Sequence, residues 1–129
     1  MKLSCGMLAA ACIAMLTTTG YAHKPASGYI SAYLVMPGCR ALIANLEPDN
    51  YQKGLCLGTV YGLGVGLRIL QDLREAGEKM PWGCVPQEVT VGQQIRVITA
   101  YIDARPNRLH EDFRELAWEA LKDTWPCKG

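Results

Sequence analysis

The chain has 129 residues, half of them hydrophobic and 19% charged, and its formal net charge at neutral pH is +1. That length allows one domain, and that composition excludes a disordered or fibrous chain. The near balance of charges argues against nucleic acid or an anionic membrane surface as the main partner, because both favour concentrated positive charge.

The N-terminal residues have the pattern of a cleaved secretory signal peptide, which we assign to residues 1–22, with a mature domain over residues 23–129. Lys2 is a short positive start, an apolar stretch follows, and Gly20 and Ala22 stand at the minus-three and minus-one positions of a cleavage site. The alternatives are a permanent membrane anchor, which needs about 20 apolar residues, and a lipoprotein attached through a cysteine. Because no second apolar segment follows, cleavage would leave a soluble protein beyond the inner membrane, with 12 acidic residues and as many basic ones.

Removal of the signal peptide also changes the cysteine count. The cysteines that remain are Cys39, Cys56, Cys84 and Cys127. In an oxidising compartment such an even set predicts two disulfides. The alternative is a zinc site, but the sequence has no Cys-x-x-Cys pair, and His110 is the only histidine well inside the domain. We therefore expect neither a metal nor a cofactor.

Residues 29–44 predict a short first helix, because aromatic and aliphatic side chains recur there at helical spacing. Pro37 and Gly38 interrupt this pattern, so we expect the helix to break at these residues. Residues 47–50 (Glu-Pro-Asp-Asn) predict the turn to the next helix.

Residues 51–76 predict a long second helix that ends at Gly77. It contains several glycines, each of which costs about 1 kcal/mol relative to alanine in a helix interior. Four of them recur at every fourth residue and form a smooth ridge: Gly54, Gly58, Gly62 and Gly66. An aliphatic stripe lies nearly opposite, on Val60, Leu63, Leu67 and Leu70. We predict that the ridge packs against a second copy in a homodimer; the alternative is that both faces belong to the core of a monomer.

Residues 77–88 predict a long connection, and two further helices follow it. Thr90 and Gln93 make the capping box Thr-x-x-Gln, which starts a helix that runs to about residue 104. The fourth helix covers residues 111–124. The expected buried positions are Val91, Ile95, Ile98 and Ile102 on the third helix and Phe113, Leu116, Ala117, Ala120 and Leu121 on the fourth.

The order of these helices selects the disulfide pairing. A short turn makes the third and fourth helices an antiparallel hairpin, which brings Cys84, before the first of them, beside Cys127, after the second. Cys39 and Cys56 are placed in the same way about the preceding turn. We predict the pairs Cys39–Cys56 and Cys84–Cys127 in a small all-α bundle of about four helices, and each pair is worth about 3 kcal/mol.

The residues offer no catalytic site, which would need a nucleophile with its base, paired carboxylates or a metal cluster. His110 stands alone at a helix start, where capping or packing explains it. We therefore expect a binding protein rather than an enzyme. Two loops offer side chains of the types found as binding anchors: Met80 and Trp82 in one loop, and Arg105 and Arg108 in the other. The simpler alternatives are a core position for Trp82 and a solubilising role for the two arginines.

A series of short motifs runs in order from about residue 53 to the C-terminus. They are Gly54-Leu55-Cys56-Leu57-Gly58, Cys84-Val85-Pro86, Thr90-Val91-Gly92-Gln93, Tyr101-Ile102-Asp103-Ala104-Arg105-Pro106 and Trp125-Pro126-Cys127. Together they resemble the Rap/Tai family of immunity proteins, and the closing Trp-Pro-Cys makes the ordered set specific.

This resemblance implies a periplasmic, helical and often dimeric protein that protects a bacterium against a peptidoglycan amidase toxin delivered by type VI secretion. Such a protein binds the toxin and occludes its active-site cleft. The alternative function is a periplasmic helical chaperone or structural stress protein with no toxin partner. The balanced charge of the mature chain disfavours this alternative, because a chaperone of that kind is expected to carry a strong net charge.

Overall fold

The structure, a computed structural model, describes residues 28–47, 49–74 and 82–128. Within these ranges the chain forms the helices α1 (Ala32–Ile43), α2 (Tyr51–Asp72), α3 (Val91–Asp103) and α4 (Phe113–Thr124), with the 3-10 turn η1 (Pro106–Arg108) between the last two. The same ranges hold no strand, and their one β-type contact is an isolated antiparallel bridge between Ser31 and Asp112. The predicted all-α fold of about four helices is confirmed.

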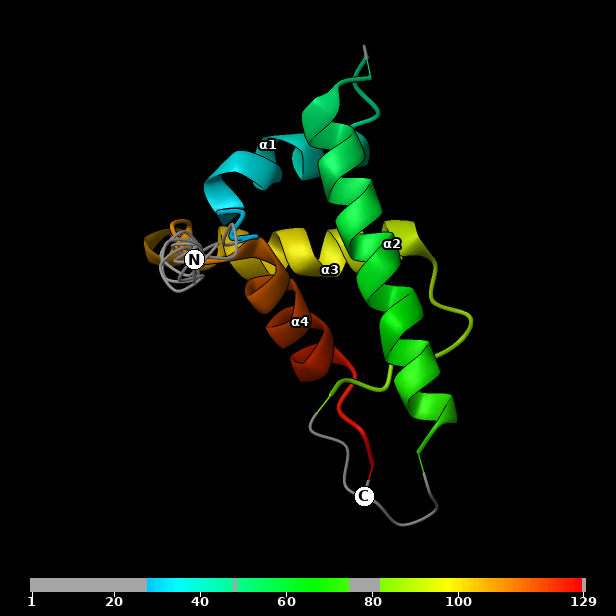
Figure 1. Cartoon of the computed structure of the whole chain (residues 1–129). Helices are drawn as coiled ribbons and strands as arrows, with labels where there is room; N and C mark the ends of the chain where they lie inside the picture. The colour runs from blue at the N-terminus through cyan, green and yellow to red at the C-terminus, as the bar shows by residue number, and fades with distance from the viewer. Residues whose placement is uncertain (1–27, 48, 75–81, 129) are drawn as a thin grey trace, which may run out of the picture.

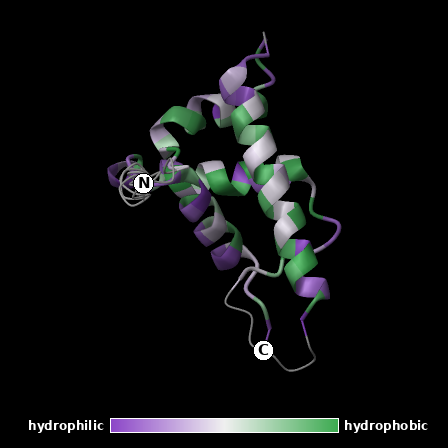
Figure 2. Cartoon of the chain, in the orientation of Figure 1, coloured by the Kyte–Doolittle hydropathy of each residue, from purple (hydrophilic) through white to green (hydrophobic). Residues whose placement is uncertain are grey.

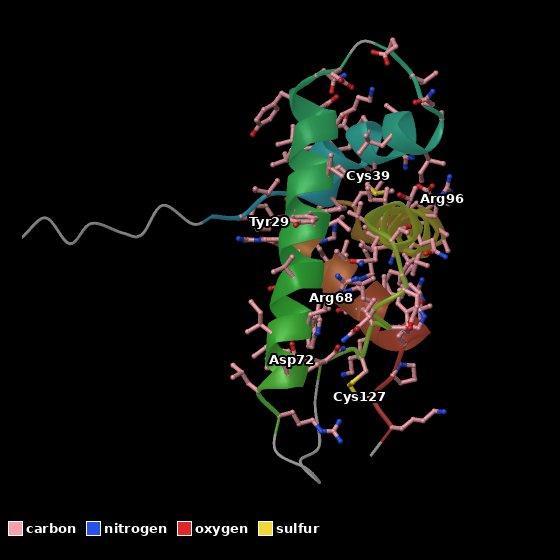
Figure 3. All side chains as sticks on the ribbon, turned by 90° about the vertical axis from the view of Figure 1, so that its right-hand side faces the viewer. Tyr29, Cys39, Arg68, Asp72, Arg96 and Cys127 are labelled. Atoms are coloured by element: carbon pink, nitrogen blue, oxygen red, sulfur yellow. A yellow bond between two sulfur atoms is a disulfide. The ribbon has the colours of Figure 1, made fainter. Side chains whose placement is uncertain are left out.

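α2 is the longest helix, and the other helices lie to one side of it. Figure 1 shows α3 crossing behind α2, and the side view in Figure 3 shows α2 along one edge of the bundle. The core between the helices consists of apolar side chains that are at most 3% exposed. They are Ala32, Val35, Met36, Cys39, Cys56, Val60, Leu67, Val85, Ile95, Ile98, Ile102, Phe113, Leu116, Ala117, Ala120 and Leu121. Of the positions predicted to be buried on α3 and α4, only Val91 is half-buried.

α1 runs unbroken through Pro37 and Gly38, so the predicted break is wrong. Pro37 removes one helical N–H and is costly inside a helix, but its neighbours Met36 and Cys39 are fully buried in the core. Glycine is required at position 38, because a Cβ there would collide with the backbone of Gln52 in α2. α1 and α2 therefore cross with their backbones in close approach, and this packing offsets the cost of the proline.

The turn between α1 and α2 is closed by Lys53, whose side chain is only 7% exposed. Its Nζ lies 2.8 Å from Oδ1 of Asp49 and also donates to the carbonyl of Leu46. Asn50 caps α2 by accepting the backbone N–H of Lys53 at 3.0 Å. A buried cation is costly unless it is paired, so these contacts fix the residue at which α2 begins.

α2 ends at Asp72, four residues before the predicted end at residue 76. Leu67 is the last of its side chains to be buried in the core, and Leu73, the C-cap, is 74% exposed. Helices in proteins depend mainly on the packing of an apolar face, and that packing is missing beyond this point. The expected stop at Gly77 lies outside the described residues, as does the expected signal peptide.

α3 and α4 form the predicted hairpin, and each starts at a side-chain cap. The side chain of Thr90 accepts the N–H of Gln93, and the carboxamide of Gln93 accepts the N–H of Thr90, so the predicted capping box is confirmed. Asp112 caps α4 by accepting the N–H of Arg114 at 2.9 Å.

Two disulfides join these elements in the predicted pairs. Cys39–Cys56 links α1 to α2 with 5.4 Å between the Cα atoms, and Cys84–Cys127 links the connection before α3 to the segment after α4 with 4.8 Å. The N–H of Cys84 also donates to the carbonyl of Trp125 at 2.8 Å. Figure 3 shows the labelled cysteines well apart along the length of α2, so each link ties a different part of the bundle.

By length and composition alone, α2 is apolar enough to span a membrane. It is nevertheless joined to α1 by a disulfide and buries Val60 and Leu67 among the other helices. Part of its apolar character therefore belongs to the core of the bundle, and the rest belongs to an outer face that is described below.

Candidate partner-binding surfaces

The loop between α3 and α4 holds its two arginines in internal contacts. Arg108 forms ion pairs with Glu111 and Glu119, each with a nitrogen–oxygen distance of 2.6 Å. Arg105 lies over the ring of Tyr101, 3.6 Å from the centroid, and donates to the carbonyl of the same residue at 2.8 Å. Both arginines are half-buried. The loop is therefore held by internal contacts of both arginines, and the charge of Arg108 is paired with two carboxylates.

These contacts also set the protonation of the cluster. Hydrogen bonds from Arg108 lower the pKa of Glu119 and of Glu111. Burial and a hydrogen bond to Glu119 raise the pKa of Tyr101, whose hydroxyl donates to that carboxylate at 3.0 Å. At neutral pH the carboxylates are ionised and the phenol is neutral, so this cluster orders the loop and supplies no group poised for proton transfer.

Trp82 lies at the other predicted loop and is partly packed. Its ring stands 5.5 Å from that of Trp118 in α4, centroid to centroid, and the residue remains 39% exposed. Nζ of Lys122 lies 5.4 Å from the Trp118 ring centroid. Gly83 packs against the backbone of Lys122, where a Cβ would come within 3.0 Å. Trp82 is thus neither a core residue nor a free side chain, and Met80 lies outside the described residues.

α4 brings the two predicted loops to one helix. The Trp82 ring packs at a tilt of 51° against that of Trp118, and Arg108 forms an ion pair with the next residue, Glu119. We call the surface formed by Trp82, Trp118, Lys122 and Arg108 the α4 flank. His110 is exposed. Among the residues that the structure describes, no group of three or more His, Cys, Asp and Glu side chains is placed to hold a metal ion.

The glycine ridge of α2 lies on the side turned away from the other helices. A Cβ added at Gly54, Gly58, Gly62 or Gly66 would meet no described atom within 4 Å beyond its chain neighbours and the backbone of its own helix turn. Large apolar side chains beside the ridge are also exposed: Tyr51 73%, Tyr61 63%, Val65 37%, Ile69 53% and Leu73 74%. Figure 2 shows α2 largely in white and green, the colours of neutral and hydrophobic residues. We call this surface, the four glycines with these side chains, the glycine face.

A pocket of about 250 Å³ lies where α2, the connection before α3 and the start of α3 meet. Its lining residues are Tyr61, Gly64, Val65 and Arg68 of α2, Gln87, Glu88, Val89 and Thr90 of the connection, and Val91 and Gln94 of α3. In Figure 3 the labelled Arg68 lies between α2 and the elements beside it. This pocket was not predicted from the sequence. Its one signal is Gly64, the glycine that departs from the spacing of the ridge.

A family model of Rap1a immunity proteins matches residues 4–127 of the chain. The chain belongs to the Rap1a immunity protein family. It matches no curated protein and no solved structure. The family to which the sequence motifs pointed is confirmed.

Membership of the Rap1a immunity family implies that the chain binds a protein toxin, and proteins of an immunity family generally act by binding rather than by catalysis. In this Rap1a-type chain, three surfaces are open to such contacts: the α4 flank, the glycine face and the pocket beside Arg68. The sequence predicted residues of the first two, whereas the third depends on the way α2 crosses α3.

Proposed function

We propose that this chain is a periplasmic immunity protein that binds a peptidoglycan amidase toxin delivered by type VI secretion and occludes its active-site cleft. The family match supports an immunity role. The signal-like residues 1–22 and the disulfides support an oxidising compartment outside the inner membrane. No catalytic group is required of the chain itself.

The observation that carries this proposal is the α4 flank, where an exposed tryptophan is held on a rigid base. An occluding segment binds best when its bound shape is already fixed, because little conformational entropy is then lost. Trp82 meets that condition, since Trp118 supports one part of its surface and Cys84–Cys127 anchors the chain two residues further on. We propose Trp82 as the main anchor, with Met80, Arg105 and Arg108 as contacts around it.

Capture from a periplasmic extract tests this function. The mature protein, residues 23–129, serves as bait, and captured proteins are identified by mass spectrometry. We expect a peptidoglycan amidase, and we expect Trp82→Ala to weaken its capture by about tenfold or more while the unfolding midpoint changes little. Leu46→Ala is the control, because it removes another large exposed apolar side chain from the turn between α1 and α2, outside the three surfaces, and should leave capture unchanged. Capture that is unaffected by Trp82→Ala would remove the α4 flank from the binding site.

The alternative function is a helical chaperone or structural stress protein. The exposed apolar glycine face is the observation that favours it, because a chaperone needs apolar surface for its clients. A light-scattering assay with unrelated proteins at acid pH separates the two functions. Suppressed aggregation without capture of any amidase would replace the immunity proposal.

We also propose that the glycine face is covered by a second copy of the chain. Two glycine ridges can approach closely, and the ridge carries no charged side chain between Tyr51 and Val65 on this face. Sedimentation equilibrium should show a dimer that Gly58→Leu dissociates, whereas Ala100→Leu, at an exposed position of α3, should not. A monomer in the unchanged protein at micromolar concentration would overturn this proposal.

A further inference from the structure

Arg68 is the only cation that lines the pocket between α2 and α3, and its charge is not neutralised within the described residues. Its Nη2 donates to the carbonyls of Gln87 and Val89 at 3.3 and 3.2 Å. Its Nε is buried and has no hydrogen-bond partner, and none of the ion pairs among the described residues includes it. The guanidinium is therefore fixed in place with unused capacity to donate to an anion.

Gln94 lines the same pocket as Arg68 and also has an unsatisfied polar atom. The residue is 3% exposed, and its Oε1 has no hydrogen-bond partner. None of the side-chain hydrogen bonds among the described residues involves its amide nitrogen, and the oxygen and nitrogen of a carboxamide can exchange places by a flip of the group. A buried carboxamide oxygen without a partner costs about 1–3 kcal/mol. Such a cost is expected where a ligand completes the site.

Gly64 provides the space that the Gln94 side chain occupies. A Cβ at that position would lie 2.6 Å from Oε1 of Gln94. The start of α3 lines the same pocket with Thr90 and Val91. The first N–H groups of a helix lack intrahelical acceptors and carry partial positive charge, which favours an anion. An arginine, a carboxamide and a helix N-terminus thus converge on one small cavity.

We propose that this pocket binds a carboxylate, and that the carboxylate is an acidic side chain of the protein partner. A volume of about 250 Å³ is below that of pockets for drug-sized ligands, about 300–1,000 Å³, and suits one inserted side chain. Arg68 neutralises the charge, and the Gln94 carboxamide turns its N–H₂ toward the anion. Assignment to the partner rests on the proposed immunity function, whereas the carboxylate chemistry stands independently of it.

The chemistry is tested with short peptides and no toxin. N-acetyl-Gly-Glu-Gly-amide and the matching Gln peptide are titrated into the mature protein labelled with nitrogen-15, and the Arg68 Nε–H and Gln94 side-chain signals are followed by NMR. We expect the Glu peptide to shift both signals at millimolar concentration and the Gln peptide to bind at least tenfold more weakly. Sodium acetate should shift the same signals, since it carries the same group. Equal binding of the two peptides, or no shift with either, would overturn the carboxylate assignment.

Three variants separate the pocket from a general charge effect. Arg68→Gln should weaken Glu-peptide binding about tenfold or more, whereas Arg96→Gln removes the same charge from an exposed position of α3 and should change it less than twofold. Glu88→Gln should strengthen binding about twofold, because this exposed lining residue opposes a carboxylate. A gain of binding cannot arise from misfolding, so an unchanged or weaker affinity in Glu88→Gln would count against the proposal.

The source of the carboxylate is tested on the captured amidase. We expect Arg68→Gln to weaken its capture and Arg96→Gln to leave it unchanged. If the Glu peptide binds and capture does not respond to Arg68→Gln, the acidic side chain does not come from the toxin and the assignment to the partner fails. If no amidase is captured at all, the immunity proposal fails while the peptide result still decides the chemistry of the pocket.

Discussion

The two faces of α2 use the same residue type for different purposes. On the inner face, Gly64 lies against Gln94, and no Cβ fits between them without a shift of that side chain. On the outer face, Gly54, Gly58 and Gly62 have open space where a Cβ would be. The inner glycine is explained by the fold of one chain, whereas the outer glycines are not.

This difference shows what a single chain can and cannot account for. Each helical glycine costs about 1 kcal/mol relative to alanine, and the outer ridge recovers none of that cost through contacts within the described residues. At Gly64, on the inner face, the close approach of α3 offsets the cost of the glycine. We expect a contact outside the described residues to offset the cost of the outer ridge, and the predictions below test the two faces against each other.

The largest effect is expected at Gly38, where α1 meets the inner face of α2. Gly38→Ala would place a methyl group against the backbone of Gln52, and backbone cannot move aside as a side chain can. We expect a loss of about 3 kcal/mol or more in the free energy of unfolding, measured by urea denaturation. A loss below about 1 kcal/mol would mean that the two helices do not cross closely.

Gly64→Ala should be the second largest effect. The new methyl group would displace the Gln94 carboxamide, whose side chain can partly give way, so we expect a loss of about 1–2 kcal/mol. The same change should alter the response of the pocket to the Glu peptide, because Gln94 moves. Unchanged stability together with unchanged peptide binding would contradict the inner contact.

Gly58→Ala on the outer face should have the opposite sign. In a dilute monomer the substitution should stabilise the chain by about 0.5–1 kcal/mol, because alanine is the better helix former and nothing lies within 4 Å of its Cβ. Sedimentation of the same variant should show weaker self-association. A destabilised monomer would show that the outer face is packed within one chain after all.

The smallest effect is expected from the charge of Asp112 at the start of α4, away from both faces. The hydrogen-bonded side chain of Arg114 lowers the pKa of Asp112, so the ionised carboxylate stabilises the folded state. That contribution is complete above the ordinary aspartate pKa and is lost as the pH falls through the lower value of the folded protein.

Asp112→Asn therefore separates charge from capping. Asparagine caps a helix as well as aspartate does, so we expect a loss of about 0.5 kcal/mol at pH 7 that becomes smaller at pH 2. Asp112→Ala also removes the cap, and it should cost about 1 kcal/mol or more at both pH values. Equal losses for Asp112→Asn at the two pH values would contradict the shifted pKa.

Local signals in the sequence predicted much of this fold. The capping box of Thr90 and Gln93 predicted the start of α3. The position of the cysteines on either side of two interhelical turns was enough to predict their pairing. The helix break predicted at Pro37 was wrong, because the unfavourable effect of proline inside a helix is outweighed by burial of the residues around it. Tertiary packing determines the helical conformation at Pro37, and no local sequence pattern indicates that packing.

The candidate sites divide in the same way. Trp82 was identifiable from residue type and from its position in a long loop, but its contact with Trp118 depends on how that loop returns to α4. The pocket of Arg68 and Gln94 was not identifiable, because its walls come from two helices that are distant in the sequence and cross in space. The only sequence signal for this pocket was Gly64, which departs from the four-residue spacing of the ridge glycines.

The most direct test of the account is an inhibition titration. The amidase captured by the mature protein is purified and its hydrolysis of peptidoglycan is followed while the protein is added back. The account predicts that activity falls in proportion to the added protein and reaches its minimum near one chain per amidase, with Trp82→Ala requiring a large excess. Full amidase activity at an excess of the unchanged protein would contradict it.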